Sequence, residues 1–184
     1  MTRIPVKYSF LLCICLLSAF ICSAQQADIN EIRTLLYKAH HSKVSALALY
    51  KKMETITPAH PLLFGYKGMA DIMMCYHTQN PYTRMQYFRS GKAALDKAIS
   101  ERRDDVELRY LRFTAQSNTP AILMYKDHLA EDKKMLLTYL LTEANKTADK
   151  DLYKRISDYL VSSEQCSAEE KNKIKSLRPV SDRS

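Results

Sequence analysis

Apolar residues recur along the chain at intervals of three and four, and no stretch of alternating apolar and polar residues is long enough to form a strand. This spacing is typical of amphipathic α-helices. Only 3 glycines and 6 prolines interrupt the pattern. The sequence therefore predicts an all-α protein, with helices over residues 28–41, 43–55, 59–77, 81–102, 105–117, 120–145, 149–162 and 168–177.

Helix-capping residues support several of these boundaries. Asn80 and Thr119 each stand directly before a proline, an order that places a capping side chain ahead of a proline at the first helical position. Ser167 and Glu170 have the spacing of a capping box. We therefore expect helices to begin directly after Asn80, Thr119 and Ser167.

The predicted helix over 105–117 is apolar on two opposite sides. One side holds Val106, Tyr110 and Phe113, and the other holds Leu108, Leu111 and Ala115. A polar strip with Arg109, Arg112 and Gln116 runs between the two sides. A helix with this pattern is packed between neighbours on both sides, so we expect it at the centre of the domain.

The predicted helix over 59–77 is apolar around most of its circumference and leaves a narrow polar strip with Lys67 and Asp71. Gly65 and Gly68 lie within it, although each glycine costs about 1 kcal/mol of helix propensity. We expect these glycines to permit a close approach of a neighbouring helix.

The N-terminus has the organisation of a secretory signal peptide. Arg3 and Lys7 precede an apolar run from Phe10 to Cys22, which Ser23 and Ala24 follow. The run is shorter than the roughly 20 apolar residues that a transmembrane helix needs. The sequence predicts a periplasmic or secreted protein, cleaved after Ala24. A retained membrane anchor and a lipid-modified Cys22 are the alternatives.

The mature chain is expected to form one domain. Loss of residues 1–24 removes two of the 28 basic residues and none of the 20 acidic ones, so the net charge falls from +8 to +6. The charge is spread along the chain, which indicates a solvated surface and argues against nucleic acid as a partner. We expect a helical domain over 25–177 and a flexible tail over 178–184.

Two cysteines, Cys75 and Cys166, would remain after cleavage. They could form a disulfide in an oxidising compartment. Alternatively, Cys75 could be a free thiol buried as a small hydrophobic group. The sequence leaves both alternatives open.

Residues 43–103 carry a spacing that resembles a tetratricopeptide repeat. Phe64 and Gly68 fall where such a repeat has its bulky residue and its glycine, and Arg103 stands where a repeat would have a proline. The residues that match the second-helix rhythm are Ala46, Tyr50, Met53 and Pro58, followed by a partial copy at Gly91, Leu95 and Ala98. The resemblance implies a single-domain, tetratricopeptide-like stack of antiparallel helical hairpins in a right-handed superhelix.

A second resemblance covers most of the chain from Pro61 to Lys134. Its segments are PLLFGYKGMADIMM, NPYTRMQYFRSGKAALDKAI, VELRYLRFTAQSNTPAILMYKD and EDKK. They are similar to segments of exported helical proteins of Bacteroidetes-type bacteria. This resemblance implies a tetratricopeptide-like fold, a location in the cell envelope and no catalytic residue.

The histidines give little indication of metal binding or catalysis. His40, His41, His60, His77 and His128 do not pair at the four-residue spacing of a helical zinc site, so no metal ligand is predicted. His128 does share a helical face with Glu131 and Asp132. These three could perform general acid–base catalysis, or they could form ordinary surface pairs.

No phosphate-binding loop, nucleophile elbow or metal-binding cysteine pair occurs in the sequence. We therefore predict no catalytic residue and no cofactor, and we do not expect an enzyme.

Arg109 and Arg112 are the strongest candidates for ligand binding. If the helices over 59–77 and 105–117 begin successive hairpins, their polar strips would line a concave groove. Guanidinium groups there could bind a carboxylate or an acidic peptide. The candidate groove residues are Lys67, Asp71, Arg109, Arg112, Gln116 and Asn118. Alternatively, Asp71, Glu107 or Asp132 could pair with the arginines inside the protein.

These observations favour an exported helical scaffold that binds a protein or peptide partner through a groove. Two other functions stay open. One is an envelope enzyme that uses the acids near His128, and the other is a component of anionic membrane surfaces.

Overall fold

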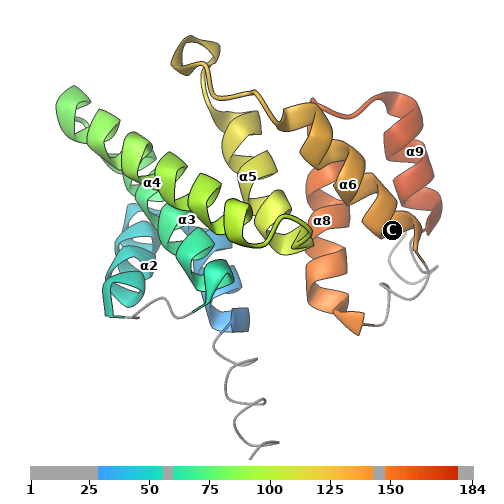
Figure 1. Cartoon of the computed structure of the whole chain (residues 1–184), viewed down its shortest axis with the longest axis horizontal. Helices are drawn as coiled ribbons and strands as arrows, with labels where there is room; N and C mark the ends of the chain where they lie inside the picture. The colour runs from blue at the N-terminus through green and yellow to red at the C-terminus, as the bar shows by residue number, and fades with distance from the viewer. Residues whose placement is uncertain (1–28, 56–59, 143–147, 178–184) are drawn as a thin grey trace, which may run out of the picture.

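The computed structural model describes residues 29–55, 60–142 and 148–177, and within these ranges the protein contains helices and no strand. The all-α prediction is confirmed. The elements are a helix over 29–39, α2 (Lys43–Thr55), α3 (Pro61–His77), α4 (Pro81–Glu101), α5 (Val106–Asn118), the short 3₁₀ helix η1 (Ala121–Leu123), α6 (Leu129–Leu141), α8 (Lys150–Ser162) and α9 (Ala168–Leu177) (Figure 1).

Some sequence predictions lie outside the described residues. They are the signal peptide over 1–24 with its cleavage site, the tail over 178–184, and Pro58 of the repeat pattern. No helix among the described residues is long and apolar enough to span a membrane.

The helices α3 and α4 pack against each other as an antiparallel pair. A Cβ atom added at Gly68 would lie 2.8 Å from the carbonyl oxygen of Gly91, and one added at Gly91 would lie 2.6 Å from the carbonyl oxygen of Gly68. Gly65 is equally close to the side chain of Leu108 on α5. Real Cβ atoms essentially never lie so close to backbone, so the close helix approach expected at Gly68 is confirmed, whereas the near neighbour of Gly65 is the end of a side chain.

Two hydrophobic clusters share the helix α5. Its residues Leu108 and Leu111 belong to a cluster with the helix over 29–39, α2, α3 and α4. Phe113, on the other side of α5, belongs to a cluster with α6, α8 and α9. In Figure 1, α5 stands between these two groups of helices. The prediction that α5 is central, with two apolar sides, is confirmed.

The predicted start of the helix over 120–145 is wrong. Thr119 ends α5 and donates its hydroxyl hydrogen to the Ala115 carbonyl at 2.7 Å, so it does not cap a following helix. After η1, Met124 adopts a left-handed conformation with φ 47°, and α6 begins only at Leu129. This path buries Tyr125 against Phe88 on α4, with the ring centroids 5.8 Å apart. A long-range contact therefore overrides the local preference for helix.

The other two caps are confirmed. The Asn80 side chain accepts hydrogen bonds from the Tyr82 and Thr83 amides at 2.9 and 3.1 Å. Ser167 and Glu170 bond reciprocally, each side chain accepting from the other residue's amide, at 2.7 and 3.1 Å. Local sequence therefore sets the starts of α4 and α9.

Cys75 and Cys166 are both free thiols. Cys75 packs against the first cluster, whereas Cys166 is buried in the second. Helix α5 stands between these clusters, so the disulfide alternative does not occur in this structure.

Candidate functional site

The arginines of α5 lie on the side of that helix that faces α6. The Asp105 side chain accepts from the Glu107 and Leu108 amides at 3.1 Å and caps the N-terminus of α5. From this start, Arg109 and Arg112 fall one turn apart, and both are buried. The capped start therefore places two guanidinium groups in the interface between α5 and α6.

Asp132 of α6 accepts hydrogen bonds from both arginines. Its carboxylate accepts from Arg109 Nη1 at 3.0 Å, and from Arg112 Nε and Nη2 at 2.7 and 2.8 Å. The Asp132 side chain is 0% exposed. Arg109 also donates to the Glu131 carboxylate at 2.8 Å and to the Arg103 carbonyl at 2.8 Å. The two arginines are therefore paired inside the protein, as the second of the two sequence interpretations expected.

His128, Glu131 and Asp132 do not act as one group. Asp132 is buried under the arginines, whereas the side chains of His128 and Glu131 are 47% and 56% exposed. A hydrogen bond links His128 Nδ1 to Glu131 at 3.2 Å, and together with Arg109 it lowers the pKa of Glu131. The arrangement is a surface pair beside a buried one, which is a poor geometry for general acid–base catalysis.

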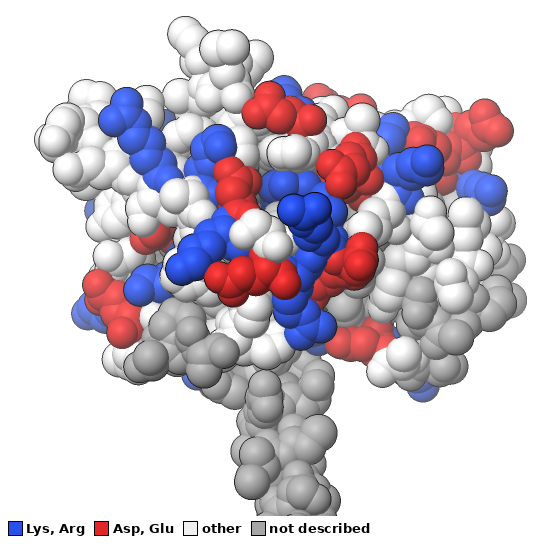
Figure 2. Space-filling view, viewed as in Figure 1, with Lys and Arg blue, Asp and Glu red and all other residues white. Residues whose placement is uncertain are grey.

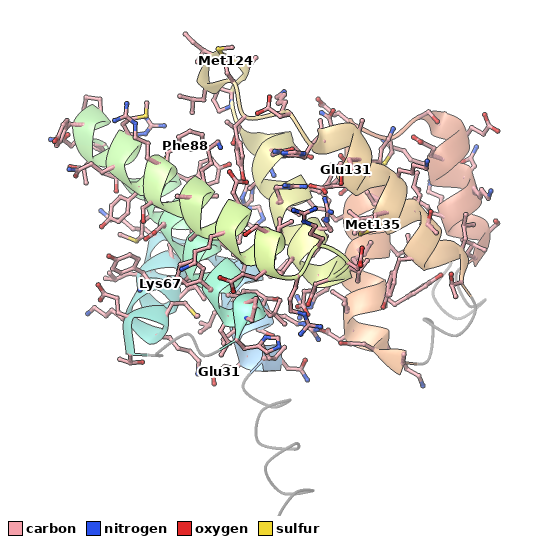
Figure 3. All side chains as sticks on the ribbon, viewed as in Figure 1. Glu31, Lys67, Phe88, Met124, Glu131 and Met135 are labelled. Atoms are coloured by element: carbon pink, nitrogen blue, oxygen red, sulfur yellow. The ribbon has the colours of Figure 1, made fainter. Side chains whose placement is uncertain are left out.

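The remaining predicted groove residues point to different neighbours. Asp71 accepts a hydrogen bond from Ser90 of α4 at 2.5 Å, and burial raises the pKa of its carboxyl. Asn118 is exposed and bonds the Tyr159 hydroxyl at 2.9 Å. Lys67 is half-buried on α3, and Figure 3 shows it well separated from Glu131, which bonds Arg109. These side chains do not converge on one surface.

Gln116 is fully buried, and neither its amide nitrogen nor its amide oxygen has a hydrogen-bond partner among the described residues. An amide in this position carries the full cost of desolvation. Gln116 is therefore an internal residue of the helix packing, and it is not exposed to a partner in a groove.

A second buried ion pair was not predicted. Arg33, on the helix over 29–39, donates two hydrogen bonds to Glu107 of α5, each 2.7 Å long. Tyr66 donates to the same carboxylate at 2.5 Å, and burial raises the pKa of Tyr66, which keeps it a donor. Asp149, the N-cap of α8, accepts from Arg33 at 2.9 Å. This network joins the helix over 29–39, α3, α5 and α8.

The sequence does carry one signal for this second network. Arg33 follows Ile32 and lies one turn from both Ile29 and Leu36, so it stands on the apolar face of its helix. A guanidinium group on such a face needs a buried partner. That partner is 74 residues away along the chain, which no local pattern could identify.

A cleft with a volume of 620 Å³ lies between α6 and α9. Its lining combines apolar side chains, which we call the floor, with charged side chains, which we call the rim. The floor comprises Leu137, Leu140, Leu141, Cys166, Ile174 and Leu177, and the rim comprises Lys133, Glu164, Glu169, Glu170 and Lys173. Lys133 bonds Glu170 at 3.1 Å and the Gln165 carbonyl at 3.0 Å, which fixes one side of the rim. We refer to this feature as the α6–α9 cleft.

The surface charges do not form a binding patch of one sign on the face that carries α4, α5 and α6. Figure 2 shows basic and acidic side chains interspersed over that face. No group of three or more His, Cys, Asp or Glu residues in the described ranges could hold a metal ion. The α6–α9 cleft is consequently the best candidate for a binding site in the described part of the chain.

Comparison with known proteins gives no further assignment. No family model matches the sequence, and no curated protein or solved structure matches it.

Proposed function

We propose that the protein is an exported helical scaffold with tetratricopeptide-like stacking, and that it binds a protein or peptide segment in the α6–α9 cleft. The antiparallel packing of α3 on α4 and the position of α5 between two clusters support a stack of hairpins. The organisation of residues 1–24 supports export.

One observation carries the proposed binding role, namely the chemistry of the α6–α9 cleft. A volume of 620 Å³ lies in the range of roughly 300 to 1,000 Å³ in which proteins hold ligands. The apolar floor suits two or three aliphatic side chains, and the charged rim suits the polar backbone and flanking charges of a peptide. Leu141, on this floor, is 44% exposed, so an occupant would remove it from water.

Site-specific photo-crosslinking tests this role in the organism that makes the protein. A photoreactive amino acid at Leu141 should give a discrete crosslinked product. The matched control is Leu47 on α2, which is 41% exposed, close to the 44% of Leu141, but lies far from the cleft. In a second experiment without a crosslinker, Leu141→Asp should abolish recovery of the same partner in a pull-down, and Leu47→Asp should not.

No product at Leu141, or the same products at both positions, would contradict the binding role. The proposed export has its own test. The N-terminal sequence of protein recovered from the envelope should begin at Gln25, and a retained Met1 or an acylated Cys22 would contradict the cleavage.

A further inference from the structure

Asp71 of α3 differs from the other buried charged side chains in the described part of the chain. Six charged side chains are buried there. Five of them belong to the two ion-pair networks around Glu107 and Asp132. Asp71 is only 7% exposed, yet its hydrogen bond comes from a neutral group, the Ser90 hydroxyl, at 2.5 Å. A buried carboxylate without a cation beside it is uncommon and costly.

The nearest charges along the helices do not neutralise this carboxylate. Lys67 lies one turn before Asp71 on α3 and is half-buried, but these two described residues form no ion pair. Burial raises the pKa of Asp71, and this effect outweighs the opposing effects of the Ser90 hydrogen bond and the Lys67 charge. Glu54 of α2 is a second carboxylate close enough to raise the same pKa. The position therefore attracts a cation.

Two tyrosine rings stand at nearly a right angle beside these carboxylates. The rings of Tyr50 on α2 and Tyr87 on α4 have their centroids 5.7 Å apart and their planes at 85°, and both residues are half-buried. Burial and the neighbouring Glu54 carboxylate raise the pKa of Tyr50 to about 12, with a smaller contribution from Asp71. Ser90, the hydrogen-bond donor to Asp71, follows Tyr87 by one turn on the same face of α4. Three helices thus bring two rings and two carboxylates together.

Aromatic rings beside carboxylates are the chemistry with which proteins bind organic ammonium groups. The face of a tyrosine ring carries partial negative charge and attracts a cation. A carboxylate adds a charge-assisted hydrogen bond to an N–H group. A metal ion fits this set of groups less well, because hard cations take six or more oxygen ligands and no group of three or more His, Cys, Asp or Glu in the described ranges could hold one.

We propose that Tyr50, Tyr87 and Asp71 form a binding site for an alkylammonium group, with Glu54 as a second carboxylate. Such a group is carried by a lysine side chain of a peptide and by a free aliphatic amine. The site belongs to α2, α3 and α4, at the left of Figure 1, whereas α6 and α9 lie at its right. It is therefore separate from the α6–α9 cleft and does not depend on the role proposed for that cleft. Bound ammonium would offset the cost of burying Asp71.

Titration of the ¹⁵N-labelled protein with n-butylammonium chloride, followed by NMR, tests the site. 1-Butanol is the matched probe, since it has the same alkyl chain and no charge, and sodium chloride keeps the ionic strength equal. Butylammonium should shift the amide resonances of Ser90 and Gly91, which adjoin the site. It should bind at least about tenfold more tightly than butanol, because only the ammonium pairs with a carboxylate.

Two substitutions on α3 test the role of charge in the site. Asp71→Asn keeps the shape of the side chain and should weaken butylammonium binding at least about tenfold. Because Asp71→Asn removes a buried charge, it should not lower Tm at neutral pH, so unfolding would not explain the loss. Lys67→Gln removes a competing positive charge and should tighten binding at least about twofold. Asp96→Asn is the control, since Asp96 on α4 is already paired with Lys92 at 2.8 Å, and it should leave binding unchanged.

Substitutions of Tyr87 test the role of the rings. Tyr87→Leu should weaken binding roughly two- to fivefold, whereas Tyr87→Phe keeps the ring and should retain binding. Tyr37→Leu is the control, because Tyr37 is 69% exposed on the helix over 29–39, outside the site. Thermal melting of each variant verifies that it folds.

Several results would overturn the inference. They are equal binding of butanol and butylammonium, undiminished binding to Asp71→Asn, and the absence of any shift with butylammonium. A loss of stability in Lys67→Gln without tighter binding would identify Lys67 as the counter-ion of Asp71 and would also overturn it. Calcium that binds where butylammonium does not would make this a metal site instead.

The source of the ammonium group is decided by one further probe, the peptide acetyl-Gly-Lys-Gly-amide. Tighter binding of this peptide than of butylammonium supports a lysine side chain of a partner protein as the ligand. Weaker binding of the peptide supports a free amine, because the backbone on either side of the lysine then hinders access to the site.

Discussion

Replacement of Asp132 by alanine is expected to destabilise the protein strongly. The Asp132 carboxylate is completely buried and accepts three hydrogen bonds, one from Arg109 and two from Arg112. Removing it leaves both guanidinium groups in the interface, where their side chains are 8% and 5% exposed. A buried charge without its partner costs about 3 to 5 kcal/mol.

The structure also predicts an order among the variants of this network. After Asp132→Ala, Arg109 keeps Glu131 and the Arg103 carbonyl, so the cost is that of one unpaired guanidinium and not of two. Arg112→Ala should cost nearly as much as Asp132→Ala. Arg109→Ala leaves the two bonds from Arg112 in place and should cost roughly 1.5 to 3 kcal/mol. Glu131→Ala, at a side chain that is 56% exposed, should cost less than about 1 kcal/mol.

Urea denaturation followed by circular dichroism measures these differences, because urea is uncharged and does not screen ion pairs. The double variant Asp132→Ala/Arg112→Ala should show a coupling of about 0.5 to 3 kcal/mol. Asp71→Ala/Arg112→Ala is the matched control. Its two effects should add within about 0.5 kcal/mol, because Asp71 bonds Ser90 on α4 and shares no partner with Arg112.

Two results would refute this reasoning. One is a loss below about 1 kcal/mol for both Asp132→Ala and Arg112→Ala, which is within the range of surface pairs. The other is coupling of Arg112 to Asp71 in place of Asp132. Either result would leave the arginines available to a ligand.

Further predictions concern a glycine and two carboxylates. Helix propensity predicts that Gly68→Ala stabilises by about 1 kcal/mol. The 2.8 Å approach to the α4 backbone instead predicts a loss of about 1 to 3 kcal/mol, and the sign of the change in Tm decides. Burial raises the pKa of Asp71. The protein therefore loses stability as the pH rises through the pKa of Asp71 in the folded state, because the buried carboxyl then ionises. Asp71→Asn should therefore raise Tm at neutral pH but not in acid, and an equal gain at both would contradict this. Burial alone would raise the pKa of Asp149, but hydrogen bonds from the Leu152 amide and Arg33 outweigh the effect of burial and lower this pKa. Its stabilisation is present at neutral pH and is lost as the pH falls through the folded pKa. Asp149→Asn should lower Tm at neutral pH and have less effect in acid, and a loss independent of pH would exclude the charge as the cause.

Features that depend on neighbours three or four residues apart could be predicted from the sequence. The period of apolar residues predicted the helices, and the two apolar sides of α5 predicted a helix between two clusters. Gly68 predicted a close approach, and Asn80 and the Ser167–Glu170 pair predicted two helix starts. Each of these signals is local, because one turn of helix brings its own residues together whatever the rest of the chain does.

The tertiary structure decided the features that depend on which helices pack against each other. The sequence offered Asp71, Glu107 and Asp132 as partners for Arg109 and Arg112, and only the packing of α6 on α5 selects Asp132.

Packing also decides the second network and the loop after α5. Glu107 pairs with Arg33, 74 residues away, and the segment before α6 leaves the helical path so that Tyr125 reaches Phe88. A buried charge must find a partner, and a large aromatic side chain must find a core. The sequence of this protein alone determined that these requirements exist, and only the assembled helices determined which residues meet them.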